Sequence, residues 1–276
     1  MVKKQLIMEN ALQLFAEQGI EATSIQQITD KCGISKGAFY LSFKSKDELI
    51  CSLIDYFMSK ITEDIEQAVN SECPHSLLLY EYYHQTFSTF EKHAHFARIF
   101  MKEHQATFNV ETFAKIEYYN DILNRLVHTI AVKQFGNVAE HMIPDIVFII
   151  QSFARSYGEL FFRDGVEIEL DLLCQSLVEK VSLIAEHATI PFFSAEWLQT
   201  MNPTVVKLSK DELICFLSKK LAETDDALIQ ESITLLRDHL TAPSLSPALE
   251  QGLLKNLRDN SHSKWIAYIY ESCDKS

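Results

Sequence analysis

Hydrophobic positions along much of this chain recur every three or four residues. That spacing places side chains on one face of an α-helix. Alternation of polar and apolar residues, the pattern of a half-buried strand, is almost absent. The pattern therefore predicts an all-α fold with four amphipathic stripes. They lie at Leu49, Leu53, Ile54, Phe57, Ile61 and Ile65; at Phe113, Ile116, Tyr119 (or Tyr118), Ile122, Leu126 and Ile130; at Ile143, Ile146, Val147, Ile150, Phe153, Ala154, Tyr157 and Phe161; and at Leu170, Leu173, Leu177, Val181 and Ile184.

Glycine and proline mark the places where these helices are expected to stop, because both residues disrupt helices. The residues concerned are Pro74, Gly136, Gly165 and Pro191. The third and fourth stripes are separated by the short polar stretch RDGVE at 163–167. They predict a long antiparallel helix pair, near 138–162 and 168–187.

The first forty-eight residues carry signals for several short helices. An amphipathic helix is expected to end near Gly19. Ser24 followed by Gln27 is a capping box, which predicts that a helix begins near Ile25. Gly33 then stands where a left-handed residue can end that helix.

A second short helix is expected directly after this glycine turn. Ser35 can cap it and place it from Lys36 to about Ser42, and Ser45 with Glu48 is another capping-box pattern that opens a third helix. Two short helices joined by a glycine-containing turn form a helix-turn-helix, whose second helix enters the major groove of DNA. The same residues also fit an ordinary helical hairpin with a solvated lysine face.

The side chains expected on the second helix suit DNA. Lys36 can reach a guanine edge or a phosphate, and Gly37 lets the backbone approach closely. Ala38 can touch a thymine methyl group, while Tyr40 and Ser42 can donate hydrogen bonds to phosphates.

Two neighbouring helix starts offer further positions for a phosphate. Lys46 lies at the start of the third helix, and Thr23 and Ser24 lie at the start of the first short helix. Free N–H groups and the helix dipole favour an anion at such positions.

A longer pattern resembles the DNA-binding domain of the TetR family of bacterial transcriptional regulators. Its marker positions are Ala11, Leu14, Phe15, Gly19, Ile20, Thr23, Ser24, Ile28, Gly33, Ile34, Ser35, Gly37, Phe39, Tyr40, Phe43, Ser45, Lys46 and Leu49. The resemblance covers about fifty residues and implies core packing for Phe39 and Phe43. It also implies DNA contact for Thr23, Ser24, Ser35, Lys36, Gly37, Tyr40 and Lys46. Thr29, Cys32 and the pair Leu41-Ser42 depart from the usual family pattern, so the operator sequence does not follow from the resemblance.

The charge distribution is compatible with a DNA-binding N-terminus. The chain has 276 residues and a net charge of −13, divided as +2 over residues 1–46, −12 over 47–190 and −3 over 191–276. A small basic surface on an acidic body can bind phosphates without attracting nucleic acid everywhere.

By the same resemblance, residues 48–190 are expected to form a helical effector-binding and dimerisation domain behind a DNA-binding domain at 1–47. Residues 76–162 hold 17 Phe and Tyr residues, an aromatic content that can enclose an apolar or amphipathic effector. Such residues also serve as ordinary core. Our pocket candidates are Phe96, Phe100, Phe113, Tyr118, Phe153 and Tyr157. The antiparallel pair is the expected homodimer interface.

Other chemistry is expected to be absent. The six cysteines are scattered and form no CxxC pair, which indicates reduced thiols in a cytoplasmic protein. No apolar run reaches the roughly 18 residues of a membrane helix, and Glu9 interrupts the N-terminal apolar stretch, so we expect neither a membrane span nor a signal peptide. His93 and His95 point about 200° apart on a helix. We therefore expect no metal site at these histidines. The sequence contains no nucleophile elbow, glycine-rich phosphate loop or HExxH motif, so we expect no cofactor and no enzyme activity.

Residues 191–276 exceed what the resemblance accounts for. Prolines divide them into short helices, expected near 195–201, 209–222, 226–240, 246–258 and 262–272. The second of these opens with SKDELICFL at 209–217, which matches SKDELICSL at 45–53 in eight of nine residues. No turn glycine or recognition helix precedes this copy. We therefore expect no second DNA reader, and an extension that packs on the body or binds a protein partner.

Two modes of control remain open for a regulator of this kind. In the first, an apolar or amphipathic small molecule releases a repressor from a palindromic operator. In the second, a protein partner acts through the C-terminal extension.

Overall fold

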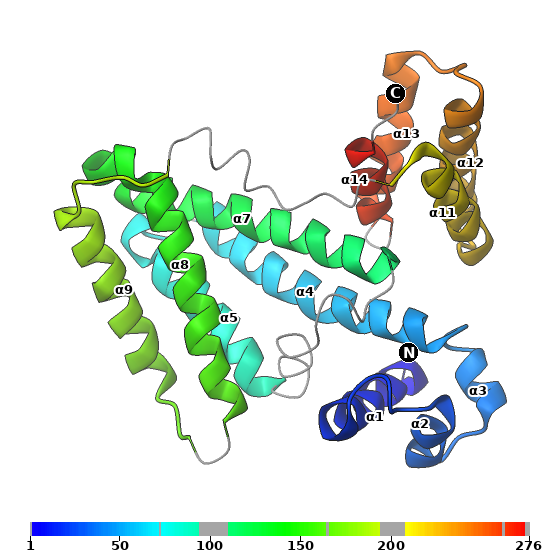
Figure 1. The fold of residues 1–276 in the computed structure, drawn as a ribbon, viewed down its shortest axis with the longest axis horizontal. Coiled ribbons are helices and arrows are strands. Elements are labelled where there is room, and N and C mark those ends of the chain that lie inside the picture. The colour runs from blue at the N-terminus through cyan, green and yellow to red at the C-terminus, as the bar shows by residue number, and fades with distance from the viewer. Residues whose placement is uncertain are drawn as a thin grey trace. The chain divides into compact units, whose positions relative to one another are not determined.

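The computed structural model describes residues 2–71, 73–93, 110–163, 166–193, 208–260 and 263–273. Over these residues the chain is helical and contains no strand, which confirms the all-α prediction. The α-helices are α1 (Val2–Gln18), α2 (Ile25–Cys32), α3 (Lys36–Tyr40), α4 (Lys46–Asn70), α5 (Leu78–Lys92), α7 (Val110–Ala139), α8 (Ile143–Gly158), α9 (Leu170–His187), α11 (Lys210–Glu223), α12 (Ala227–Thr241), α13 (Pro247–Asp259) and α14 (Lys264–Ser272) (Figure 1). Short 3₁₀ turns lie at His75–Leu77, Glu140–Met142 and Glu159–Phe162.

The chain forms two compact units. The first comprises Met1–Thr112 and Tyr119–Met201, and the second comprises Phe113–Tyr118 and Asn202–Ser276. Six residues of α7 thus belong with a part of the chain that lies far away in sequence. The predicted boundaries at 47/48 and 190/191 stay predictions.

The first unit is organised along α4. Every fourth residue from Leu49 to Ile65 on this helix is buried, as the first hydrophobic stripe predicts. Next to α4 packs α5, whose Phe87 ring stacks on Phe161 with 5.5 Å between ring centroids. Gly158 makes room for the neighbouring Phe90 ring, because a Cβ atom there would lie 2.9 Å from Phe90 Cε2.

The helix pair α8 and α9 is antiparallel, as predicted (Figure 1). At the start of α8, the buried carboxylate of Asp145 accepts hydrogen bonds from the backbone N–H groups of Phe192 and Phe193, all at 3.2 Å. These bonds hold residues 192 and 193, which follow α9, against the start of α8.

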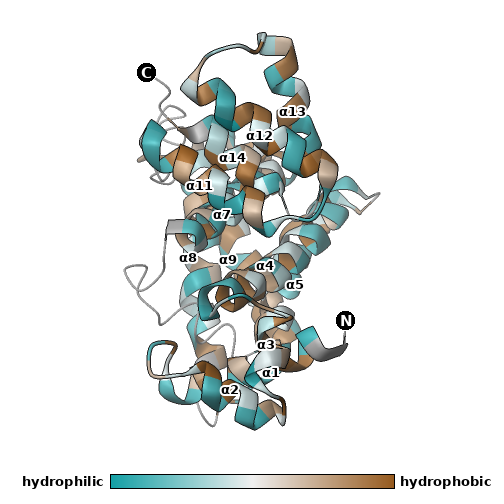
Figure 2. Ribbon diagram, turned by 90° about the vertical axis from the view of Figure 1, so that its right-hand side faces the viewer, coloured by the Kyte–Doolittle hydropathy of each residue, from teal (hydrophilic) through white to brown (hydrophobic). Residues whose placement is uncertain are grey.

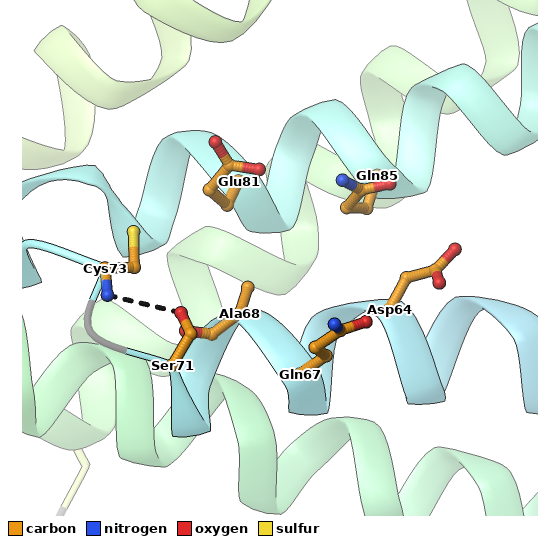
Figure 3. Close-up of a pocket in the computed structure, with 7 residues that line it drawn as sticks. All are labelled: Asp64, Gln67, Ala68, Ser71, Cys73, Glu81 and Gln85. Carbon is orange, nitrogen blue, oxygen red and sulfur yellow. Dashed lines mark hydrogen bonds between the residues drawn. The ribbon is translucent and has the colours of Figure 1, made fainter.

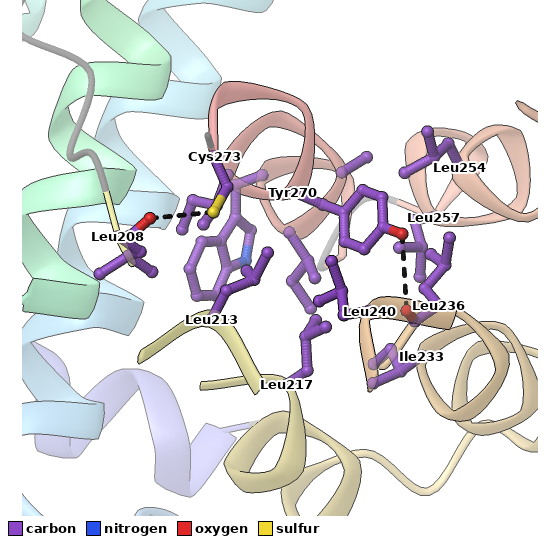
Figure 4. Packing of buried hydrophobic residues seen from close by; sticks show 14 of the residues in the cluster. Leu208, Leu213, Leu217, Ile233, Leu236, Leu240, Leu254, Leu257, Tyr270 and Cys273 are labelled. Atoms are coloured by element: carbon purple, nitrogen blue, oxygen red, sulfur yellow. Dashed lines mark hydrogen bonds between the residues drawn. The ribbon is translucent and has the colours of Figure 1, made fainter. Parts of the chain in front are cut away.

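The second unit has a hydrophobic core of its own (Figure 4). Its four C-terminal helices are amphipathic, each with hydrophobic and hydrophilic residues (Figure 2). Leu213, Leu217, Ile233 and Leu236 are fully buried between them. Two buried hydrogen bonds join residues of this core: Tyr270 OH donates to Leu236 O at 3.5 Å, and Cys273 Sγ donates to Leu208 O at 2.9 Å (Figure 4).

The short segment of α7 is part of that core. Ala114 is buried in it, and the Lys115 ammonium lies 4.8 Å from the centre of the Trp265 ring. Tyr118 packs edge-on against Tyr268, with ring centroids 5.6 Å apart.

Helix positions were well predicted in the C-terminal region. The expected helices at 209–222, 226–240, 246–258 and 262–272 lie within two residues of α11, α12, α13 and α14. The expected helix at 195–201 lies outside the described residues.

Two local predictions were wrong. Gly136 does not end a helix: α7 runs through it to Ala139, since packing of the helix outweighs the weak propensity of one glycine. Glu48 does not close a capping box on Ser45, because its carboxylate accepts instead from the N–H of Lys44.

Candidate nucleic-acid interface

The turn between α2 and α3 is set by its caps. Ser24 and Gln27 form the predicted capping box at the start of α2. Gly33 ends the helix in a left-handed conformation with φ of 65°, which a residue with a side chain rarely adopts. The next N–H, of Ile34, donates to Thr29 O at 3.0 Å and closes the turn.

The helix α3 is anchored from one side. The Ser35 hydroxyl accepts from the N–H of Ala38 at 3.2 Å and caps the helix start. Phe39 is fully buried and its ring lies 5.9 Å from that of the buried Phe43. Burial of these two rings leaves the opposite face of α3 directed outward.

Most predicted DNA-contact residues lie on the outside of this domain. Tyr40 is 51% exposed. Ser24, Ser35, Lys36 and Gly37 are also exposed, while Ala38 and Ser42 are half-buried. The outer face of α3 therefore presents the Lys36 ammonium and the hydroxyl groups of Ser35 and Tyr40 to solvent. Contact of these groups with DNA stays a prediction.

Two of the predicted DNA-contact side chains form hydrogen bonds within the domain itself. Thr23 is buried, and its hydroxyl donates to Gly19 O at 2.7 Å. The Lys46 ammonium donates to Ile20 O at 3.0 Å and to Thr23 O at 3.1 Å. These side chains hold the loop before α2 against the start of α4, which makes them less available to a phosphate than the sequence suggests.

Sequence reasoning missed two exposed residues beside α3. Leu41 is 91% exposed directly after the helix, and Lys44 is exposed before α4. The signal for Leu41 was its departure from the usual family pattern. A position two residues from a buried phenylalanine on a helix must face outward.

The structure does not bring the predicted effector residues into one described site. Phe96 and Phe100 lie outside the described residues. Phe153 and Tyr157 lie half-buried on α8 with ring centroids 6.0 Å apart. Phe113 and Tyr118 belong to the second compact unit.

Two hollows lie between α4 and α5 instead. One, of about 410 Å³, is lined by Asp64, Gln67, Ala68, Ser71, Cys73, Glu81 and Gln85 (Figure 3). The other, of about 310 Å³, includes Lys60, Lys92 and His93. Burial lowers the pKa of His93, and the positive charge of Lys92 lowers it further. None of the predicted effector residues lines either hollow.

Metal-binding clusters and membrane-spanning helices are absent from the part of the chain that the structure describes. No group of three or more His, Cys, Asp and Glu side chains there is placed to hold a metal ion. No described helix is both long and apolar enough to cross a membrane.

The geometry defines a DNA-binding helix-turn-helix domain, and the comparisons give its family. Residues 7–60 match the family model described as bacterial regulatory proteins, tetR family. The N-terminal domain thus matches the DNA-binding domain of TetR-family transcriptional regulators.

Relatives from Bacillus subtilis match nearly the whole chain. The HTH-type transcriptional regulator YerO is 28% identical over 268 residues, which cover 92% of this chain and 89% of that protein. YuxN, also an HTH-type transcriptional regulator, is 25% identical over 281 residues, which cover 94% of this chain and 92% of YuxN. Matches of this extent must reach well into residues 191–276, so these relatives share C-terminal sequence with the chain.

A solved structure has the same fold as about two thirds of the chain. The transcriptional regulator FadR from Bacillus subtilis, in complex with stearoyl-CoA, matches with a TM-score of 0.56 and 19% identity. The match covers 67% of this chain and 99% of FadR.

Proposed function

We propose that this protein is a cytoplasmic, homodimeric repressor, released from a palindromic operator when an apolar or amphipathic small molecule binds its helical body. The observation that carries the DNA-binding part is the outward face of α3, held rigidly by the buried Phe39. Because this short helix is already fixed, Lys36 and Tyr40 can enter a major groove without the entropy loss of ordering the backbone on binding.

Homodimerisation is proposed through α8 and α9. A two-fold dimer places two recognition helices about 34–36 Å apart, in successive major grooves of a palindromic site. The proposed effector binds more tightly to the DNA-free conformation than to the DNA-bound conformation. The ratio of its two affinities sets the factor by which operator affinity falls.

The effector class rests on composition and on a likeness in fold. The aromatic body has the content expected around an apolar ligand. FadR, which shares the fold, is described with stearoyl-CoA bound. For this chain we infer an apolar or amphipathic molecule, with Phe96, Phe100, Phe113, Tyr118, Phe153 and Tyr157 as candidate contacts.

A specific observation favours a second mode of control, by a protein partner of the C-terminal extension. The second unit has its own core and exposes Leu228 and Leu249 on its surface. This alternative predicts that Leu228→Glu with Leu249→Glu alters repression in cells while the purified variant binds the operator normally. Under the small-molecule mode, repression stays at the wild-type level.

The first test is selection of bound genomic fragments by the purified protein at about 150 mM salt, where non-specific phosphate binding is weak. Enrichment of a short palindrome supports the proposal. Failure to enrich any site, with ligand-stripped and refolded protein as well, contradicts it.

The recognition helix is tested by Lys36→Ala combined with Tyr40→Phe. We expect operator binding to weaken by about 10-fold or more, because two base or phosphate contacts per half-site are lost. The matched control is Lys60→Ala with Tyr56→Phe on α4, where Tyr56 is also 51% exposed. Equal binding by both double variants would remove the assignment of α3. Sedimentation of each variant tests whether the proposed dimer stays intact.

A further inference from the structure

Gly37 is not required by the fold of the domain. Its φ lies outside the positive range that favours glycine, since Gly19 and Gly33 are the positive-φ glycines among the described residues. A Cβ atom added at Gly37 would meet only the Ser35 hydroxyl oxygen, at an ordinary contact distance of 3.8 Å. Glycine is a poorer helix former than alanine. The missing side chain is therefore explained by something that approaches from outside.

Leu41 is the exposed partner of this glycine. Its N–H donates to Gly37 O at 3.1 Å and its φ and ψ of −73° and −21° are helical, so it continues the turn of α3. Four residues apart, Gly37 and Leu41 lie one above the other on the helix. Both are two residues from the fully buried Phe39, which places them on the side of α3 opposite the core.

This Gly37–Leu41 ridge is therefore the outermost line of the recognition helix. Gly37 leaves a notch on the ridge because it has no side chain, and next to it stands the apolar side chain of Leu41, which is 91% exposed. A single exposed leucine is common on protein surfaces. The unoccupied notch beside it is an independent feature that points to a ligand of matching shape.

The 5-methyl group of thymine fits this ridge. In the major groove thymine presents a methyl group beside its O4 acceptor, and the other three bases present hydrogen-bonding groups and no methyl group. Leucine can pack on the thymine methyl group. On guanine, adenine or cytosine it would lose this contact and desolvate donors and acceptors that it cannot satisfy.

We propose that the Gly37–Leu41 ridge receives a thymine methyl group and requires thymine at one position of each operator half-site. The inference rests on the proposed operator binding and names a residue, Leu41, that determines its specificity. Lys36 precedes and Lys44 follows this ridge in sequence, and both are exposed; in this proposal they contact the flanking phosphates.

The test replaces each thymine of the selected operator by deoxyuridine, which lacks only the methyl group, symmetrically in both half-sites. For the wild-type protein we expect one replacement to weaken binding about four-fold per half-site, the value that burial of one methyl group predicts. For Leu41→Ala the same replacement should change affinity less than two-fold. Leu249→Ala, at a leucine that is 61% exposed in the second unit, is the matched control and should keep the wild-type response.

Gly37→Ala provides a second, complementary measurement. The added methyl group fills the notch, so binding to the thymine operator should fall, and deoxyuridine at the same position should restore part of it. Melting temperatures of Gly37→Ala and Leu41→Ala should equal or exceed that of the wild type, which separates a binding defect from unfolding.

Three results would overturn the inference. The first is a wild-type affinity insensitive to every deoxyuridine replacement, and the second is an unchanged response in Leu41→Ala. In both, operator binding itself survives. The third is failure to select any operator, which overturns the proposed function and this inference with it.

Discussion

Nearly the same nine residues begin α4 and α11, and the two copies have different surroundings. In both, a serine caps the helix and accepts from the N–H three residues later, at 3.0 Å for Ser45 and 3.4 Å for Ser209. Both also place Asp and Glu in the first turn, where carboxylates are favoured. The helix start is thus encoded locally.

The glutamates of the two copies already differ. The Glu212 carboxylate accepts from the N–H of Ser209 at 2.8 Å and from its hydroxyl at 2.7 Å, so the capping box is complete. Glu48 instead accepts from the N–H of Lys44. What precedes the serine therefore decides where the glutamate binds.

Burial separates the copies further. Cys51 is buried, with its sulfur 3.0 Å from Thr112 Oγ1, whereas Cys215 is exposed. Lys46 binds two carbonyl groups, while Lys210 is exposed at the surface. The comparison teaches that one short sequence determines a helix and one buried stripe, and that neighbouring elements determine the remaining faces.

The largest expected effect comes from the stripe that both copies share. Leu49→Ala and Leu213→Ala each remove a fully buried side chain and should lower the free energy of unfolding by about 2–5 kcal/mol. Hydrogen exchange should place the loss in 46–60 for the first variant and in 210–223 for the second. A loss spread equally over both segments in either variant would contradict two separate cores.

A smaller effect is expected from the lysines, and it should differ between the copies. Lys46→Met removes two hydrogen bonds from a charged donor to the carbonyls before α2, and should destabilise the protein by about 1–3 kcal/mol. Lys210→Met, at an exposed position, should stay within about 0.5 kcal/mol of the wild type. Equal denaturation midpoints for the two variants would show that the Lys46 bonds contribute nothing.

The smallest effect concerns pH and the completed capping box. The backbone N–H and hydroxyl of Ser209 hold the pKa of Glu212 below its ordinary value of 4.5. A lowered pKa in the folded state stabilises the protein above the ordinary value, and this contribution disappears as the pH falls through the lowered pKa.

Glu212→Gln should accordingly lower the melting temperature slightly at pH 6, and the difference from wild type should shrink below pH 4.5. Asp211→Asn removes the same charge from an exposed neighbour and is the matched control. If both variants show the same pH dependence, the effect belongs to net charge and not to the cap.

Much of the helix-turn-helix could be predicted from the sequence because its signals are local. Ser24, Gly33 and Ser35 each act on residues within four positions, and the structure confirms the caps that they form. The outward and inward faces of α3 followed from the same short-range geometry.

Contacts between residues distant in sequence could not be predicted from local patterns. Lys46 reaches carbonyl groups more than twenty positions earlier, and Thr23 is buried in the same loop. Phe113 and Tyr118 continue a regular stripe of α7, yet they join a unit built from residues after 201. Periodicity shows which face of a helix is apolar, but it contains no information about which element covers that face.

By itself, the sequence determined the helices, their caps and the family of the N-terminal domain, because capping and amphipathic spacing act over a few residues. Only the tertiary structure decided which of two nearly identical helix starts is buried on several faces, and that Lys46 and Thr23 are bound inside the domain. Those properties depend on contacts across the chain, whose free energies no local pattern records.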